Sequence, residues 1–372
     1  MNTEFLNDAF NSYFEKGIAA KNAGNIQEAK RQLMLAAETL KKIVAESTGE
    51  LKLSRQKRVL SILETIEALD GKKVISSAKN DANGENETTP KFNIIEPSGN
   101  SSVPAMEELN RLVGLATVKE SIDELKKLAE YNLERKKRGI SGSSSMSLHL
   151  VFTGNPGTGK TTVARIIGQL YKEIGLLERG HLVETDRGAL VGGYVGHTAP
   201  LVKKAVEAAM GGVLFIDEAY TLSEKSENDF GKEAINTLLK EMEDKRDKFV
   251  LIVAGYTKPM EGFIASNPGL KSRFNTYIEF DDYKDAELSE IFGKIVAEKY
   301  TITDDAMELV ANHFAEVYKQ RQGDFANARG ARNLYEKIIV KQAKRLSSML
   351  ERADDNELVT ITTQDVQAVI GK

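Results

Sequence analysis

Apolar residues recur at helical spacing along three stretches between residues 3 and 70, and the positions between them are polar. The stretches run from Phe5 to Ile18, from Ile26 to Ile43 and from Val59 to Leu69. Each apolar stripe lies on one side of its helix, so the three helices can bury these sides against one another. The pattern predicts a small three-helix bundle at residues 1–73.

This periodic pattern is nearly lost between residues 74 and 103, where Gly, Asn and Ser are frequent and apolar residues are few. A segment of this composition cannot bury enough apolar surface to fold by itself. It predicts a flexible linker, which separates the bundle from the patterned sequence that begins at Pro104.

The sequence after Pro104 alternates between apolar runs and helical patterns. Five strands are predicted, at about 148–153, 182–185, 213–217, 249–254 and 276–280. Strands that alternate with helices are typical of an α/β domain, in which helices cover both faces of a mostly parallel sheet. We expect this domain to span residues 104–281.

Beyond Asp281 the sequence predicts helices alone. Four helical segments are expected, at about 284–299, 303–320, 328–349 and 363–370. We expect them to form a separate small lid at residues 282–372.

Composition narrows the class of protein. The 372 residues carry a net charge of −4 and include no cysteine. No apolar run reaches the roughly 18 residues of a membrane span, and the N-terminus lacks the basic and apolar segments of a signal peptide. We therefore expect a cytoplasmic protein without disulfides or a membrane span. The negative charge also argues against nucleic acid as the main partner.

The most specific motif lies between the first predicted strand of the α/β domain and the helix after it. Residues Gly154–Thr161 match the phosphate-binding pattern G-x-x-x-x-G-K-[ST]. Backbone N–H groups of such a loop surround phosphates, and the following helix N-terminus adds a partial positive charge. We expect Lys160 to reach the β- and γ-phosphates of ATP and Thr161 to bind Mg²⁺. The predicted nucleotide-binding residues of this loop are Asn155, Pro156, Gly157, Thr158, Gly159, Lys160, Thr161 and Thr162.

Two carboxylates follow the apolar run Val213–Ile216 and complete the predicted ATP site. In a parallel sheet the end of this strand lies at the same edge as the phosphate loop. Asp217 is expected to orient Mg²⁺ or its water ligands, and Glu218 to polarise the attacking water. A solvated acidic turn is the structural alternative, and the phosphate loop upstream favours catalysis over it.

With Ile216-Asp217-Glu218-Ala219-Tyr220 beside a phosphate loop, the chain resembles the AAA+ ATPases. Residues 106–350 resemble, more narrowly, the family that contains red-type rubisco activase and stage V sporulation protein K. The matching blocks lie in order along the chain: Leu112–Leu115, the phosphate loop, Leu190–Ala199, Phe230–Ala234, Ala254–Tyr256 and Asn267–Phe274. The resemblance implies an AAA+ fold with a helical lid, hydrolysis of ATP with Mg²⁺, and assembly into a hexameric ring.

The resemblance also implies roles for residues outside the two motifs. Arg273 matches the arginine finger that stabilises charge at the γ-phosphate held by a neighbouring subunit. Arg332 matches the lid arginine that contacts nucleotide phosphates, with Arg329, one helical turn before it, as the second choice. Val113 and Gly114 match the segment that packs on the adenine ring.

Tyr194 lies in a glycine-flanked loop, where a large amphipathic ring on a mobile backbone can grip a polypeptide of any sequence. The resemblance implies that this loop lines the pore of the ring; a tyrosine folded back onto the sheet is the structural alternative. Thr198 can cap the helix that follows the loop. Many AAA+ proteins carry an Asn after the fourth strand, but this sequence has none there, and Tyr256 or Thr257 is expected to orient the water instead.

The turn between the first two helices resembles those of tetratricopeptide repeats and of MIT (microtubule-interacting and trafficking) domains. A tetratricopeptide array needs about three repeats, and only one helical pair with a third helix is predicted, so the MIT-like interpretation is preferred. An MIT-like domain tethered to an AAA+ module resembles the organisation of Vps4-type ATPases.

Together these features predict an oligomeric ATPase that remodels a protein partner recruited by the N-terminal bundle. A slow nucleotide-dependent switch or scaffold that threads no substrate is the alternative from another class. A DNA clamp loader or helicase would share the nucleotide site, but the acidic charge and the Gly-Tyr-Val-Gly loop argue against it.

Overall fold

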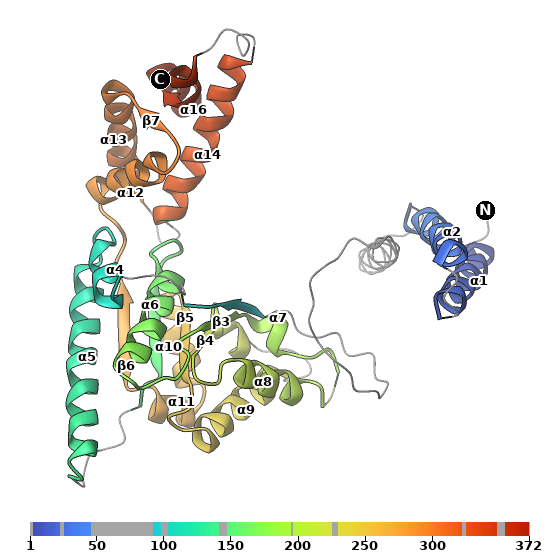
Figure 1. Cartoon of the computed structure of the whole chain (residues 1–372), viewed down its shortest axis with the longest axis horizontal. Helices are drawn as coiled ribbons and strands as arrows, with labels where there is room; N and C mark the ends of the chain where they lie inside the picture. The colour runs from blue at the N-terminus through green and yellow to red at the C-terminus, as the bar shows by residue number, and fades with distance from the viewer. Residues whose placement is uncertain are drawn as a thin grey trace. The chain divides into compact units, whose positions relative to one another are not determined.

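The computed structural model describes residues 3–22, 26–45, 92–97, 103–140, 147–194, 196–224, 230–321, 325–347 and 354–371. The chain divides into two compact units, Met1–Glu87 and Thr88–Lys372 (Figure 1). Among the described helices, none combines the length and the apolar character that crossing a bilayer requires.

Two helices of the first unit, α1 (Thr3–Asn22) and α2 (Ile26–Ala45), pack against each other. Gly17 lets them approach closely, since a Cβ there would lie 2.7 Å from the Leu33 side chain. Their buried apolar residues are Phe10, Ala29, Leu33, Ala36, Ala37, Leu40 and Ile43. The predicted third helix lies outside the described residues, and the MIT-like interpretation stays a prediction.

The second unit is built on a six-stranded sheet with the strand order β1-β3-β4-β5-β2-β6. Its strands are β1 (Asn93–Ile95), β2 (Leu150–Gly154), β3 (Leu182–Thr185), β4 (Val213–Ile216), β5 (Val250–Gly255) and β6 (Thr276–Phe280). Neighbouring strands from β3 to β6 pair in parallel, and β1 pairs with β3 in the antiparallel direction. The central strands β4 and β5 are buried along their whole length, which explains their uninterrupted apolar sequence.

Strand β1 corrects the predicted linker at 74–103, because residues 93–95 belong to the sheet. This edge strand is held by backbone pairing with β3 and by a bond from Asn93 Nδ2 to Glu184 Oε2 of 3.0 Å. Ile94 is half exposed, so this strand does not need the apolar sequence pattern that marks a buried strand. Three residues are too few for a strand period to be recognised. The linker residues 74–91 lie outside the described part of the chain.

Helices cover both faces of the sheet because successive side chains of each strand point to opposite faces. Phe152 of β2 packs in the core formed with α4 (Ala105–Arg111), α5 (Ala116–Lys137) and α6 (Lys160–Glu173). Its neighbour Val151 packs in the core on the other face. The helices on that face are α7 (Arg187–Leu190), α8 (Thr198–Ala208), α9 (Phe230–Asp244), α10 (Thr257–Ala265) and α11 (Pro268–Arg273). This arrangement confirms the predicted α/β class.

The lid follows the sheet, and its core is continuous with the core around α6. Its helices are α12 (Asp285–Ala297), α13 (Asp304–Lys319), α14 (Asn327–Leu346), α15 (Asp355–Val359) and α16 (Thr363–Ile370). The expectation that strands stop at Asp281 was wrong, since β7 (Thr301–Ile302) and β8 (Thr360–Ile361) pair in parallel within the lid. A two-residue strand has no period to detect, and the partners of this pair lie far apart in the sequence.

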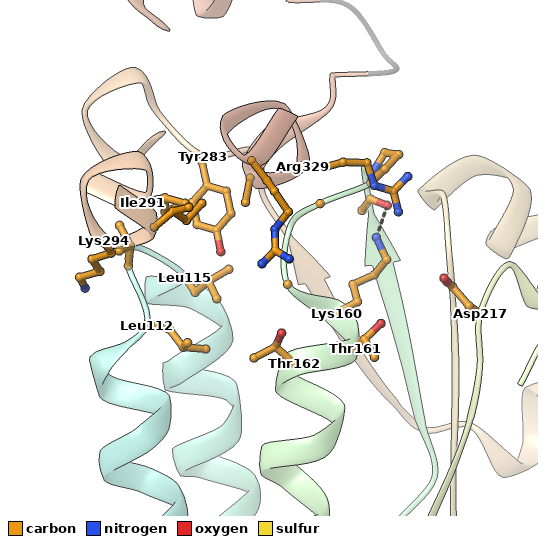
Figure 2. A pocket seen from close by; sticks show the side chains of 18 of the residues that line it. Leu112, Leu115, Lys160, Thr161, Thr162, Asp217, Tyr283, Ile291, Lys294 and Arg329 are labelled. Atoms are coloured by element: carbon orange, nitrogen blue, oxygen red, sulfur yellow. Dashed lines mark hydrogen bonds between the residues drawn. The ribbon is translucent and has the colours of Figure 1, made fainter. Parts of the chain in front are cut away.

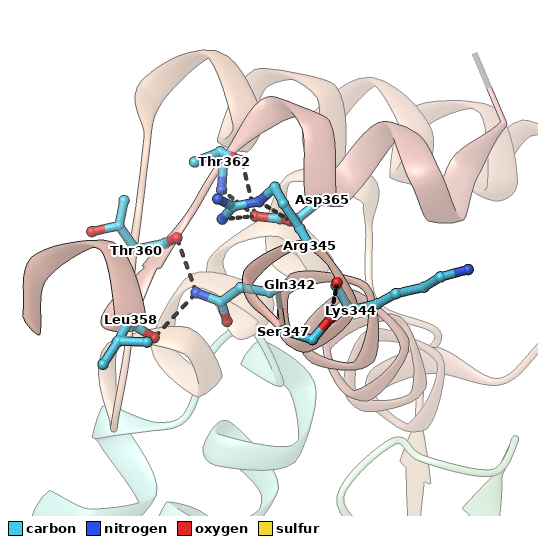
Figure 3. A network of polar contacts seen from close by, with 8 residues as sticks. All are labelled: Gln342, Lys344, Arg345, Ser347, Leu358, Thr360, Thr362 and Asp365. Atoms are coloured by element: carbon cyan, nitrogen blue, oxygen red, sulfur yellow. Dashed lines mark hydrogen bonds and ion pairs between the residues drawn. The ribbon is translucent and has the colours of Figure 1, made fainter. Parts of the chain in front are cut away.

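Two side chains of α14 fasten the C-terminal segment to the lid (Figure 3). Gln342 Nε2 donates to the carbonyl oxygens of Leu358 and Thr360 at 3.3 and 3.0 Å. Arg345 donates to both carboxylate oxygens of Asp365, at 2.7 and 2.9 Å, and Asp365 is 1% exposed. Burial alone would raise the pKa of Asp365, but bonds from Arg345 and Thr362 outweigh it and hold the pKa below its ordinary value of 3.8.

We predict that Asp365→Asn destabilises the protein by about 2 kcal/mol at neutral pH, because Arg345 loses a charged hydrogen-bond acceptor. The folded-state pKa of Asp365 is lowered, so its stabilisation is present above about pH 4 and is lost as the pH falls through the folded value. Thermal unfolding of both proteins across this range measures the effect. Glu336→Gln is the control, because it removes an exposed carboxylate from the same helix, α14. A loss of stability in Asp365→Asn that stays the same as the pH falls below about 4 would contradict the prediction.

Candidate nucleotide-binding site

The carboxyl ends of three parallel strands meet at one edge of the sheet and form the floor of a pocket. β2 ends in Gly154, β4 is followed by Asp217, and β5, which lies between them, is followed by Tyr256. The pocket has a volume of about 630 Å³. Its walls come from the phosphate loop, the connection between α4 and α5, and the lid helices α12 and α14 (Figure 2).

The phosphate loop lies where the sequence predicts it, between β2 and α6. Gly157 and Gly159 have φ values of 73° and 96°, which side chains rarely tolerate. The Thr158 hydroxyl donates to the Asn155 carbonyl oxygen at 2.8 Å and closes the loop. Pro156, Gly157, Gly159, Lys160, Thr161 and Thr162 line the pocket. Asn155 and Thr158 do not line it: the Thr158 side chain bonds within the loop, and the Asn155 side chain bonds to Asp282 at the boundary with the lid.

The Lys160 ammonium points over the phosphate loop. It donates to the carbonyl oxygens of Gly154 and Asn155 at 2.9 and 2.8 Å. Burial lowers the pKa of Lys160, and the Asp217 carboxylate opposes this shift. A buried cation with neutral acceptors gains from an anion placed beside it. The loop is therefore suited to bind phosphate groups at Lys160.

The backbone holds the two carboxylates at the pocket. The Asp217 N–H donates to the Thr185 carbonyl oxygen at 3.0 Å, which fixes the end of β4 against β3. The Glu218 N–H donates to Asp217 Oδ1 at 3.0 Å. Glu218 has a left-handed backbone with φ 49°, and its exposed side chain lines the pocket. Strain of this kind at a non-glycine residue is common at functional sites.

The far end of the pocket is apolar and suited to a planar base. Leu112, Val113 and Leu115 face Ile291 and Ile295 of α12 there. Gly114 does not line the pocket. It has φ 59°, and a Cβ at this position would lie 2.4 Å from the Glu287 carboxylate, so Gly114 lets α12 approach. The charged side chains at the rim of this end are Arg111, Lys294 and Glu298.

Both lid arginines that the sequence singles out, Arg329 and Arg332, line the pocket from α14. Tyr256 also lines it, whereas Thr257 begins α10 and does not. Of the two residues expected to orient water, the geometry thus favours Tyr256.

Two further predicted residues, Arg273 and Tyr194, also lie outside this pocket. Arg273 ends α11, and its Nη2 donates to Glu243 Oε2 at 3.1 Å. Tyr194 lies in the loop between α7 and α8 and is 73% exposed. Neither position conflicts with its expected role, since both roles need a second molecule.

Three residues at the boundary between sheet and lid escaped the sequence analysis. Tyr283 lines the pocket, and Asp282 and Asn327 bond to the phosphate loop. The pair Asp281-Asp282 directly after a predicted strand was the available signal for one of them. Asn327 is the first residue of the segment Asn327–Asn333 that carries the lid arginines, but the sequence predicted no role for it.

Comparison with known proteins identifies this fold. The family model described as ATPase family associated with various cellular activities (AAA) matches residues 150–282, and the AAA lid domain model matches residues 284–372. The chain belongs to this AAA ATPase family. It is therefore an ATP-hydrolysing enzyme, and the predicted fold with its helical lid is confirmed. The described helices α1 and α2 lie outside both matches.

The relatives include named proteins of the family that the sequence resembles. The chain is 43% identical to stage V sporulation protein K of Bacillus subtilis over 261 residues, which cover 70% of this chain and 80% of that protein. It is 43% identical to protein CbbX of Cereibacter sphaeroides, covering 73% and 89% of the two chains. It is also 43% identical to the chloroplastic ribulose bisphosphate carboxylase/oxygenase activase of Cyanidioschyzon merolae, covering 70% and 89%.

A solved structure shares the architecture at low identity. The FIGL-1 AAA domain in complex with ADP superposes with a TM-score of 0.50 at 18% identity, covering 69% of this chain and 81% of that chain.

We predict that Glu218→Gln retains ATP binding and lowers ATP turnover by at least about 100-fold, because the amide cannot accept a proton from the attacking water. Lys160→Ala is the contrasting variant and should lose ATP binding, because the β- and γ-phosphates lose their cation. Binding by calorimetry and phosphate release together distinguish the two. Normal turnover in Glu218→Gln would remove Glu218 from the proposed chemistry.

Proposed function

We propose that this protein is an ATP-driven motor that works as a homo-oligomeric ring and remodels a protein partner. The observation that carries the proposal is the exposed ring of Tyr194, presented on a glycine-flanked loop of an AAA ATPase. Such a motor needs to hydrolyse ATP, to couple neighbouring subunits and to grip its substrate. The nucleotide site, Arg273 and the Tyr194 loop would supply these three functions in turn.

The residues present fit ATP with Mg²⁺. Lys160, the loop N–H groups and the N-terminus of α6 form a cationic cradle for the β- and γ-phosphates. Thr161 and Asp217 offer oxygen atoms, which Mg²⁺ prefers. The bound nucleotide with its metal supplies the cleavable phosphoanhydride. Glu218 would polarise a water, Tyr256 after the neighbouring strand β5 would help to orient it, and Arg329 and Arg332 would neutralise negative charge from the lid.

Arg273 acts on the nucleotide of a neighbouring subunit in this proposal. Its support is that Arg273 lies outside the pocket of its own chain, at the C-terminal end of α11. Glu243 bonds to the guanidinium at 3.1 Å, and Ser147 Oγ donates to the Arg273 carbonyl oxygen. The first bond holds the partly buried side chain and the second holds the backbone, so the arginine is kept at a defined place, as a group that must meet a second subunit requires.

The Tyr194 loop is anchored at its base and open at its tip. The Gly192 N–H donates to Thr198 Oγ1 at 3.1 Å, so the buried Thr198 side chain holds the loop and does not cap α8 as expected. Among the described residues, no atom other than those of the chain neighbours lies within 4 Å of a Cβ placed at Gly193 or Gly196. The Tyr194 ring contacts His197 edge-on at 5.7 Å between centroids. An aromatic side chain so presented can contact a polypeptide without reading its sequence.

The N-terminal unit serves in this proposal as the recruitment module. The apolar stripe of α2 packs against α1, so the polar outer surfaces of this pair are left to meet a partner helix. We place the protein in the cytoplasm on the grounds given by its sequence.

We predict that an unfolded polypeptide such as casein stimulates ATP turnover by the wild type and that Tyr194→Ala abolishes the stimulation. The loop grips the chain by the aromatic ring, so Tyr194→Phe should keep most of it. Phosphate release with and without casein measures this effect relative to each variant's basal rate. Equal stimulation of wild type and Tyr194→Ala, or none of the wild type, would contradict the motor and support the switch or scaffold.

A further inference from the structure

The first turn of α14 is bonded directly to the backbone of the phosphate loop. The Ala328 N–H donates to the Gly157 carbonyl oxygen at 3.1 Å, and Asn327 Nδ2 lies 3.3 Å from the Pro156 carbonyl oxygen. The Tyr283 hydroxyl donates to the Thr158 carbonyl oxygen at 3.3 Å. Three successive residues of the loop thus have a partner in the lid or at its boundary.

Asn327 is the residue around which these bonds are arranged. It is 2% exposed and adopts φ 50°, a left-handed conformation that Asn tolerates better than most residues. Its Oδ1 accepts from the Tyr283 N–H at 2.9 Å. Its Nδ2 donates to Asp282 Oδ1 at 2.7 Å and also lies 3.0 Å from the Phe325 carbonyl oxygen. Both ends of the amide are therefore engaged within the protein.

Asp282 joins this amide to the phosphate loop a second time. Its carboxylate accepts from Asn155 Nδ2 at 2.9 and 3.1 Å, and from Asn327 Nδ2 as well. The bonds form a closed circuit from the loop through Asn155 and Asp282 to Asn327, and back to the loop at Pro156. A circuit of this kind resists changes in the relative position of loop and helix more than a single bond does.

The lid arginines lie directly beyond this circuit on the same helix. Arg329 and Arg332 follow Asn327 within the first two turns of α14 and line the pocket. The backbone contact at Gly157 is close, since a Cβ there would lie 2.8 Å from the backbone nitrogen of Arg329. The start of α14 therefore fixes where both guanidinium groups stand relative to the phosphates that the loop would hold.

We propose that Asn327 is a positioning residue that sets the register of α14 against the phosphate loop and acts on ATP through Arg329 and Arg332. A displacement of the lid is transmitted to the phosphate loop through the Asn327 side-chain amide, which Asp282 holds in place by a hydrogen bond. The proposal rests on the nucleotide chemistry of the preceding subsection. It gives the Asn-Ala-Arg segment a function beyond that of its arginines.

The test compares Asn327→Gly with Arg332→Ala and with the double variant. Glycine tolerates φ 50° and removes every side-chain bond, so backbone strain does not confuse the result. We expect Asn327→Gly to lower kcat at least about tenfold and to change KM for ATP by less than about threefold, because Lys160 and the loop N–H groups still bind. In the Asn327→Gly background, Arg332→Ala should cost less than about twofold, since the arginine is already misplaced.

Gln342→Ala is the matched control for a merely structural role. It removes a buried amide of the same helix that bonds Leu358 and Thr360, away from the pocket. An equal loss of kcat in Gln342→Ala, independent effects of Asn327→Gly and Arg332→Ala, or wild-type kcat in Asn327→Gly would each overturn the proposal.

A donor–acceptor exchange keeps the test decisive should Asn327→Gly fail to fold. Asn327→Asp places two carboxylates face to face and should be less active than the pair Asn327→Asp with Asp282→Asn, in which Asn at 282 donates to Asp at 327. A pair no more active than Asn327→Asp alone overturns the positioning role. A wild type that binds no ATP would overturn the proposed function itself, whereas an active wild type with an unaffected Asn327→Gly overturns only this inference.

Discussion

The close approach of the lid backbone to Gly157 is the contact on which the nucleotide pocket depends. A Cβ at that position would lie 2.4 Å from the Ala326 carbonyl oxygen, so any side chain there would push the lid away. Because the glycine allows the contact, Asn327 reaches Pro156 across 171 positions of sequence. Two segments that lie far apart in the sequence, the phosphate loop and the start of α14, thus close the pocket together. Its chemistry then depends on how firmly those elements are held together.

The parallel sheet supplies the other half of the site. Its order places β5 between the strands that carry the phosphate loop and the acidic pair, so three strand ends face one volume. Because β4 and β5 are buried and paired on both sides, their carboxyl ends are held rigidly. The Asp217 and Glu218 carboxylates, which directly follow β4, are therefore also held in place. The lid packs against this edge, and the core around α6 continues into it through residues such as Phe292 and Ile338.

The sequence predicts those parts of the fold whose patterns are long or whose motifs are specific. The strand β4 and the loop at Gly154–Thr161 follow from an apolar run and a glycine pattern. Strands β1, β7 and β8 escaped prediction because two or three residues show no period and their pairing is non-local. The site was predicted where a motif marks it, at Lys160 and Glu218. The contacts of Asp282 and Asn327 were not, because they arise only when the fold brings these residues to the loop.

Arg273 and Tyr194 differ from the pocket residues because their proposed roles each require a second molecule. Both lie at the surface of a single chain, and both are proposed to act on another molecule, so one chain cannot complete their sites. Glu243 holds the first and Thr198 holds the base of the loop that carries the second.

Mixing two inactive variants tests this account most directly. Arg273→Ala keeps its own pocket but offers no finger, and Glu218→Gln keeps its finger but cannot activate water. If hydrolysis needs two copies of the chain, phosphate release should be very low for each variant alone and should rise when they are mixed, because Arg273 of one copy serves the intact pocket of the other. A mixture no more active than its components, or an Arg273→Ala protein as active as wild type, would contradict catalysis between subunits.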